Sequence, residues 1–99
     1  MEFVLYEQKG QYAIITINRE KALNALNSAV LDELDKTLDS VDLDQVRCLI
    51  LTGAGQKSFV AGADISEMVN FTAAEARAFG MRASVPFFKL MNMRQVTIA

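Results

Sequence analysis

A short apolar run near the middle of the chain constrains the fold more than any other feature. Residues Val46–Thr52 are mostly apolar, and Gly53-Ala54-Gly55 follows them directly. A run of this length that ends in glycines is typical of a strand buried on both faces. We therefore expect a strand here that other elements cover from two sides.

Two further strands are predicted before this run. Phe3–Tyr6 and Tyr12–Ile17 are rich in aromatic and β-branched residues, and the polar stretch Glu7–Gln11, which contains Gly10, lies between them. Two such runs joined by a glycine-containing turn are typical of a β-hairpin. The pattern therefore predicts a hairpin over residues 3–17.

A helix is predicted between the hairpin and the apolar run. Its apolar residues recur every three or four positions and so trace one stripe of a helix: Val30, Leu31, Leu34, Leu38 and Val41. Asn27 or Ser28 is the expected N-cap, and the helix should end between Val41 and Asp44. The first half of the chain therefore has the pattern of a β-β-α-β unit.

Two capping signals predict two more helices in the second half of the chain. Asp64 stands three residues before Glu67, and Thr72 stands three residues before Glu75. This spacing is typical of a capping box, in which the two side chains satisfy each other's backbone N–H groups. We expect a short helix after Asp64, a longer one after Thr72, and a final strand over Gln95–Ala99.

The longer helix is expected to run from Ala73 toward Met91, but Gly80 and Pro86 interrupt its pattern. A proline inside a helix removes a hydrogen bond and costs about 3 kcal/mol. The sequence therefore predicts a kink or break near Ser84 or Val85.

The overall composition bounds the size and the class of the protein. Its 99 residues, 52% of them hydrophobic, fit a single domain over residues 1–99, or a piece of a larger one, with no linker. Ten basic and twelve acidic residues provide no basic field for nucleic acid or for an anionic membrane. No apolar run approaches the roughly 20 residues of a membrane helix, and we expect a cytoplasmic protein.

Cysteine and histidine usage excludes several chemistries within the chain. Cys48 is the only cysteine, and its apolar neighbours predict a buried thiol without a disulfide or metal role. Histidine is absent, which excludes Ser-His-Asp and Cys-His arrangements and the commonest zinc ligand. We expect no metal site.

The main candidate site lies in Phe59–Met68, where the small residues Ala61, Gly62 and Ala63 lead into a helix. Small side chains let a ligand approach the backbone, and a helix N-terminus favours an oxyanion or phosphate. This segment is a candidate catalytic device that needs no catalytic side chain. Asp64 and Glu67 are an alternative acid–base pair, although helix capping already accounts for both.

Two other segments suggest phosphate binding less strongly. Leu51–Ser58 follows a strand, but a P-loop needs glycine before its lysine, and Gln56 precedes Lys57 here. In Arg19–Asn27, Lys21 could neutralise a phosphate, while the simpler interpretation is a solvated turn that ends in an asparagine cap. Composition alone favours the solvated turn.

Two motifs together resemble the crotonase family of enoyl-CoA hydratases and isomerases, above all its bacterial short-chain hydratases. They are Asn18–Leu26 and Lys57–Met68, in that order, and Leu49–Gly53 between them and Val96–Ala99 after them fit as well. The resemblance implies an α/β fold, the N-terminal part of the crotonase ββα spiral and incomplete. It weakens between Met81 and Arg94.

The resemblance also assigns roles to residues. It implies that two backbone N–H groups hold the carbonyl oxygen of a coenzyme A thioester, one of them on Ala63. It implies that coenzyme A binds against residues of both motifs: Lys21, Ala22, Leu23, Lys57, Ala61, Gly62, Asp64 and Ile65. The thioester is then a substrate, and no permanently bound cofactor is expected.

The implied reaction is the reversible hydration of a short trans-2-enoyl-CoA, a step of fatty acid metabolism. The second oxyanion donor and the two glutamates of such hydratases match no residue of this sequence, so we expect the chain alone to be inactive. Another reaction on the same scaffold stays open: isomerisation, thioester hydrolysis or dehalogenation. A non-catalytic coenzyme A-binding or interaction module is the alternative of a different class. Family membership also implies a homo-oligomer, a trimer or a pair of trimers, without nucleic-acid or membrane partners.

Overall fold

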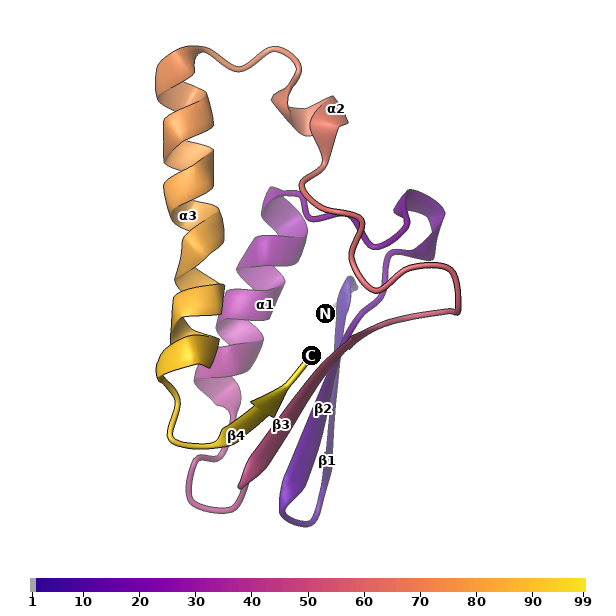
Figure 1. The fold of residues 1–99 in the computed structure, drawn as a ribbon, viewed down its shortest axis with the longest axis vertical. Coiled ribbons are helices and arrows are strands. Elements are labelled where there is room, and N and C mark those ends of the chain that lie inside the picture. Colours follow the sequence, from indigo (N-terminus) through magenta and orange to yellow (C-terminus); the bar gives the residue numbers. More distant parts are fainter. Residues whose placement is uncertain (1) are drawn as a thin grey trace.

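The computed structural model describes residues 2–99 and shows a mixed α/β chain, as the sequence predicts (Figure 1). The elements in chain order are β1 (Val4–Lys9), β2 (Tyr12–Ile17), the 3-10 helix η1 (Glu20–Ala22), α1 (Ser28–Ser40), β3 (Cys48–Gly53), α2 (Ile65–Met68), α3 (Ala73–Asn92) and β4 (Val96–Ile98).

The four strands form one sheet in the order β1-β2-β3-β4. β1 pairs antiparallel with β2, whereas β2 with β3 and β3 with β4 are parallel pairs. Ile15 lies opposite Leu51, and Leu49 lies opposite Thr97. The predicted β-β-α-β unit and the predicted last strand are therefore confirmed.

The hairpin turn is shorter than predicted. β1 continues to Lys9, which pairs with Tyr12, so only Gly10 and Gln11 form the turn, where a polar loop over Glu7–Gln11 was expected. Gly10 has a φ of 61°, a left-handed conformation that favours glycine in two-residue hairpin turns. The polar residues 7–9 pair along the strand because β1 is an edge strand that solvent reaches.

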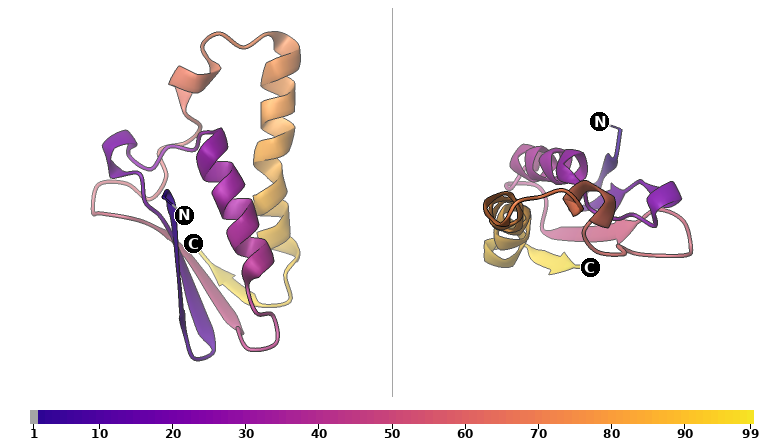
Figure 2. Two further views of the ribbon diagram at one scale, coloured as in Figure 1. Left: turned by 180° about the vertical axis from the view of Figure 1, so that it is seen from behind. Right: turned by 90° about the horizontal axis from the view of Figure 1, so that it is seen from above.

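α1 and α3 lie on the same side of the sheet (Figure 2), and the core lies between these helices and the strands. α1 starts as predicted, with Asn27 as the N-cap whose side chain accepts a hydrogen bond from Val30 N at 2.9 Å. Its apolar stripe packs with alternate residues of β2 and β3: Ala13, Ile15, Ile17, Leu49 and Leu51.

The prediction that the apolar run is buried on both faces is wrong. In β3, Leu49 and Leu51 are buried under the helices, while Cys48 and Ile50 are half-buried on the opposite face. The predicted buried thiol of Cys48 is wrong for the same reason, because within residues 2–99 helices cover one face of the sheet only.

α3 continues through Pro86 as one helix. Of the kink or break predicted near Ser84 or Val85, the break is therefore wrong, and the kink stays a prediction. Pro86 is fully buried, and burial of its apolar ring offsets the missing backbone hydrogen bond. The predicted capping box is present at the start of this helix: Thr72 accepts a hydrogen bond from Glu75 N at 3.2 Å, and the Glu75 side chain accepts one from Thr72 N at 3.0 Å.

Charges link the two helices in addition to apolar packing. The ammonium group of Lys89 on α3 lies 2.5 Å from the Asp35 carboxylate and 2.8 Å from the Asp39 carboxylate of α1. Arg82 of α3 pairs with Asp32 of α1 in the same way. These ion pairs connect α1 and α3 at two positions along their length.

Candidate functional site

Two loops meet at one edge of the sheet. The first loop (residues 18–27) follows β2, and the second loop (residues 54–64) follows β3 (Figure 1). Because β2 and β3 are parallel neighbours, both loops leave the sheet at the same edge, which is where binding sites of parallel sheets form. Both predicted motifs lie in this region.

A short backbone bridge joins the two loops and orients Ala63. Leu26 N donates to Gly62 O at 2.8 Å, and Asp64 N donates to Leu26 O at 2.8 Å. Gly62 O and the Ala63 N–H belong to one planar peptide group and point in opposite directions. The Ala63 N–H therefore points away from the first loop, and within residues 2–99 it has no hydrogen-bond acceptor.

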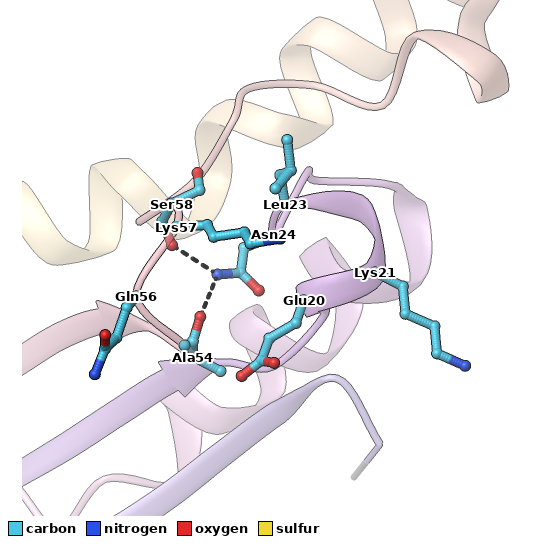
Figure 3. A pocket seen from close by; sticks show the side chains of 9 residues that line it. Glu20, Lys21, Leu23, Asn24, Ala54, Gln56, Lys57 and Ser58 are labelled. Carbon is cyan, nitrogen blue, oxygen red and sulfur yellow. Dashed lines mark hydrogen bonds between the residues drawn. The ribbon is translucent and has the colours of Figure 1, made fainter.

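The side chain of Asn24 links the same loops from inside (Figure 3). Its amide nitrogen donates to Ala54 O at 3.0 Å and to Ser58 O at 2.9 Å, and its oxygen accepts from Arg19 N at 2.9 Å. Asn24 is almost completely buried. Its polar atoms are therefore used to hold the loops in register, and they are not available to a ligand.

The first loop has an unusual backbone. Leu23 and Asn24 have φ values of 54° and 59°, the left-handed region that non-glycine residues rarely adopt. Leu23 is 46% exposed despite being a large apolar residue. Such a conformation costs of order 1 kcal/mol or more and is common at ligand-binding loops. The first loop is thus held in shape by its surroundings.

Arg19 and Asp64 form the main ion pair of the site. Arg19 Nη1 lies 2.7 Å from Asp64 Oδ2 and also donates to Ala25 O at 3.0 Å. The other Asp64 oxygen accepts from Ser66 N and Ser66 Oγ. The hydrogen bond from Ser66, and then that from Arg19, lower the pKa of Asp64 to about 2. Asp64 is therefore ionised at neutral pH and is unsuited to act as a general acid.

Glu67 does not complete the predicted capping box with Asp64. Asp64 does cap α2 through Ser66 N, but the Glu67 carboxylate reaches the first residue of α1, where it accepts from Ser28 N at 3.1 Å and from Ser28 Oγ at 2.5 Å. The capping-box prediction is therefore wrong for Glu67. Both carboxylates are occupied by structural contacts, which disfavours their use as an acid–base pair.

A hollow of about 360 Å³ lies between the loops, at the small end of the range for ligand pockets. Its lining residues are Glu20, Lys21, Leu23, Asn24, Ala54, Gly55, Gln56, Lys57 and Ser58. The lining includes three predicted binding residues, Lys21, Leu23 and Lys57. The side chain of Lys21 extends away from the other side chains drawn in Figure 3.

The remaining predicted residues do not line the hollow. Ala61, Gly62 and Ala63 are exposed on the second loop, Ala22 is half-buried in η1, and Ile65 is exposed at the start of α2. Ala61 N donates to Leu23 O at 3.1 Å, which brings the two motifs together. All the predicted site residues therefore lie on or beside two adjacent loops.

Sequence reasoning missed Arg19 and Asn24 as the residues that connect the loops. Asp64, the partner of Arg19, is 45 positions away, and Ser58, a partner of Asn24, is 34 positions away. No local pattern in the sequence signals such pairings. Over residues 2–99, side chains of histidine, cysteine, aspartate and glutamate do not gather in a group that could hold a metal ion. In the same part of the chain, no helix combines the length and apolarity needed to cross a membrane.

Sequence comparison places this chain among named relatives. The profile of the Enoyl-CoA hydratase/isomerase family matches residues 12–96. The chain is 48% identical over 97 residues to a short-chain-enoyl-CoA hydratase of Clostridium acetobutylicum, covering 97% of this chain and 37% of that protein. It is 43% identical over 99 residues to a crotonyl-CoA hydratase of Syntrophomonas wolfei, covering 99% of this chain and 38% of that protein.

Comparison with solved structures agrees with the comparison of sequences. The chain superposes on an enoyl-CoA hydratase of Bacillus anthracis with a TM-score of 0.90 and 28% identity, covering 96% of this chain and 38% of that one. A second match is an enoyl-CoA hydratase/carnithine racemase of Magnetospirillum magneticum, with a TM-score of 0.88, 29% identity and coverage of 98% and 38%. The chain thus spans less than two fifths of the length of these relatives.

Proposed function

The chain belongs to the enoyl-CoA hydratase/isomerase family, and from this premise we propose that its two loops bind a coenzyme A thioester and that the Ala63 N–H donates to the thioester carbonyl. The observation that carries the proposal is the direction of this N–H group. It lies on the exposed part of the second loop, points away from the first loop, and lacks an acceptor within residues 2–99.

The chemistry of a thioester explains why such a donor matters. When the α-carbon gains enolate character, negative charge grows on the carbonyl oxygen, and a preoriented N–H stabilises that charge more than the ground state. Loss of one oxyanion donor typically lowers the rate by about 10²–10³-fold. Because Gly62 O and Asp64 N on either side of Ala63 are held by hydrogen bonds with Leu26, the Ala63 N–H needs little reorganisation when the charge develops.

The rest of the coenzyme is proposed to lie along the two loops. Lys57 beside the hollow, and Lys21 at its margin, supply positive charge for phosphate groups. Leu23, exposed in its left-handed conformation, and the neighbouring Ala22 offer apolar contacts to the pantetheine part. Ala61, Gly62, Asp64 and Ile65 are proposed to contact the adenine mainly through their backbone.

We propose reversible hydration of a short trans-2-enoyl-CoA as the reaction this binding site serves, in line with the names of the two bacterial relatives. Asp64 and Glu67 are committed to structural contacts, so neither is proposed to move a proton. For the chain of residues 1–99 we therefore expect binding without turnover. An isomerase, thioester hydrolase or dehalogenase would use the same donor. The predicted homo-oligomer and the predicted cytoplasmic location stay predictions.

Titration of the isotopically labelled chain with acetyl-CoA and with free coenzyme A tests the proposal. Only acetyl-CoA carries a thioester carbonyl, so we expect the Ala63 amide signal to shift with acetyl-CoA and to stay in place with coenzyme A, while signals of the first loop respond to both. Lys57→Ala should weaken binding of either compound, and Lys36→Ala, which removes an exposed lysine of α1, should not. An Ala63 signal that ignores acetyl-CoA at saturation would refute the donor assignment.

An assay for hydration separates the enzymatic alternatives from a binding module. Crotonyl-CoA loses its ultraviolet absorbance when water adds across the double bond, so turnover can be followed directly. Measurable hydration by the chain of residues 1–99 would contradict the expected inactivity. Saturable coenzyme A binding with no turnover would support a binding unit that needs acid–base groups from other residues.

A further inference from the structure

We propose that Arg19 is a positioning residue of this site, which joins the two loops and thereby fixes the direction of the Ala63 N–H. The catalytic meaning of this inference rests on the proposed function of Ala63. The positioning itself is a property of the two loops and can be tested separately.

The contacts of one guanidinium nitrogen carry the argument. Arg19 Nη1 donates to Ala25 O in the first loop at 3.0 Å and to Asp64 Oδ2 at the end of the second loop at 2.7 Å. A guanidinium nitrogen carries two N–H bonds that diverge in one plane, so it can serve two acceptors at once. Arg19 therefore connects the loops through a single rigid group.

These two acceptors flank the backbone bridge that orients Ala63. Ala25 precedes Leu26, and Asp64 follows Ala63, so the guanidinium closes a small ring of contacts around the Leu26–Gly62 hydrogen bond. Gly62 has a φ of 119°. Glycine has more conformational freedom than other residues, so this backbone can rotate easily unless its neighbours hold it. If the loops separate, the peptide between Gly62 and Ala63 loses its only partner in the first loop and becomes free to rotate.

The surroundings of this ion pair make it stronger than an ordinary surface pair. The side chains of Arg19 and Asp64 are 21% and 13% exposed, against 46% and 53% for Arg82 and Asp32. Water screens a partly buried pair less than an exposed one. Arg19 also lowers the pKa of Asp64, second to the hydrogen bond from Ser66, so the carboxylate keeps its charge at pH values where an ordinary aspartate is protonated.

Arg19→Met in the chain of residues 1–99 tests the proposal, with amide hydrogen exchange measured by NMR. We expect the Leu26 and Asp64 amides, which form the backbone bridge, to exchange about tenfold faster than in the unchanged chain, because local opening becomes easier. Amides of the sheet, such as that of Leu49, should keep their rates. Arg82→Met is the matched control, since it also removes a guanidinium–carboxylate pair but leaves both loops intact.

Ligand titration of the same variant links positioning to the site. We expect Arg19→Met to retain affinity for free coenzyme A within about twofold, while the additional response of the Ala63 amide to acetyl-CoA is lost. A merely structural role would weaken both ligands together. If Ala63 of the unchanged chain ignores acetyl-CoA, the proposed function fails, and the exchange rates still decide whether Arg19 positions the loops.

Two results would overturn the proposal. One is unchanged exchange at Leu26 and Asp64 in Arg19→Met; the other is faster exchange spread evenly over the sheet, which would make Arg19 a general stability residue. Should Arg19→Met fail to fold, Asp64→Asn replaces it, because asparagine also caps helices well and removes only the charged partner. The same loop-specific acceleration is then expected.

Discussion

Among the glycines of the chain, Gly53 has the least room for a side chain. A Cβ atom built on it would lie 2.1 Å from Phe59 O and 2.7 Å from the Asn24 amide nitrogen. The first contact is with backbone, which cannot swing away as the end of a flexible side chain can. Glycine at this position is therefore required by the approach of the second loop to the end of β3.

We expect Gly53→Ala to destabilise the protein by about 3 kcal/mol, because the second loop must shift to admit a methyl group. Gly80→Ala is the control: it lies in α3 with open space around its Cα and should stabilise by about 0.5–1 kcal/mol. Urea unfolding of both variants measures the difference. Equal stabilities would contradict the close packing described for Gly53.

Comparison of the two predicted capping boxes shows what local sequence can reveal about individual residues. The Thr72–Glu75 box forms because each side chain finds its partner within the same helical turn. Glu67 has the same spacing from Asp64, yet it binds Ser28, 39 positions away. Spacing therefore identifies the N-cap residue reliably in both cases, but a partner distant in sequence can take the second side chain.

Between the two helices, ion pairs join α1 to α3. Lys89 is held by Asp35 and Asp39, and its hydrogen bonds to Asp35 and then to Asp39 raise its pKa. A raised lysine pKa stabilises the folded state fully at neutral pH, and this contribution disappears as the pH rises through the raised value. The three charged groups are partly exposed, so salt should weaken the attraction between them.

We expect Lys89→Met to lower the urea midpoint at pH 7, because the two aspartates then lie close together without a cation. The loss should shrink in 1 M salt and vanish as the pH rises above the pKa of Lys89. Lys36→Met, on the exposed side of α1, serves as the control and should change the midpoint little. A loss that is the same at every salt concentration would contradict an electrostatic cause.

The order and type of the helices and strands could be predicted from the sequence. Which faces of the strands are covered by other elements could not. The stripe on α1 and the strand at Val46–Thr52 follow from periodicity, which depends on local geometry. How many layers cover a strand depends on the rest of the fold, and this is why Cys48 is less buried than predicted. Pro86 was predicted to kink or break α3, yet the helix is continuous, and the burial of the proline ring is not visible in the sequence.

The candidate site could likewise be predicted only in part. The two motifs identify both loops, since small residues and the helix cap are local features. Arg19 and Asn24 act across the space between the loops, and their roles appear only once β2 and β3 are paired.

Besides those on the loops, apolar side chains are exposed on two larger surfaces of the molecule. One is the outward face of α3, and the other is the uncovered face of the sheet. Large residues exposed there are Met81, Val85, Phe88, Met91, Val96 and Ile98. Apolar patches of more than a few hundred Å² are rare on monomers and favour association.

We therefore expect the chain of residues 1–99 to self-associate as its concentration rises, with sedimentation velocity as the measurement. Phe88→Lys together with Met81→Lys should shift the distribution toward monomer, because both charges lie on the outward face of α3. A double replacement of the exposed residues Lys36 and Glu7 by serine, which leaves the apolar surface unchanged, should not. A chain that stays monomeric at several hundred micromolar would refute the expectation.

The bridge between Leu26 and Ala63 also bears on the order of events during folding. It closes a segment that includes α1 and β3, so we expect it to form after β2 and β3 have paired. Contacts that form after the rate-limiting step influence how fast a protein unfolds and hardly alter how fast it folds. In stopped-flow experiments, replacement of Arg19 should thus accelerate unfolding while the refolding rate stays nearly constant. The loops of the site would then be the last part of the chain to order and the first to open.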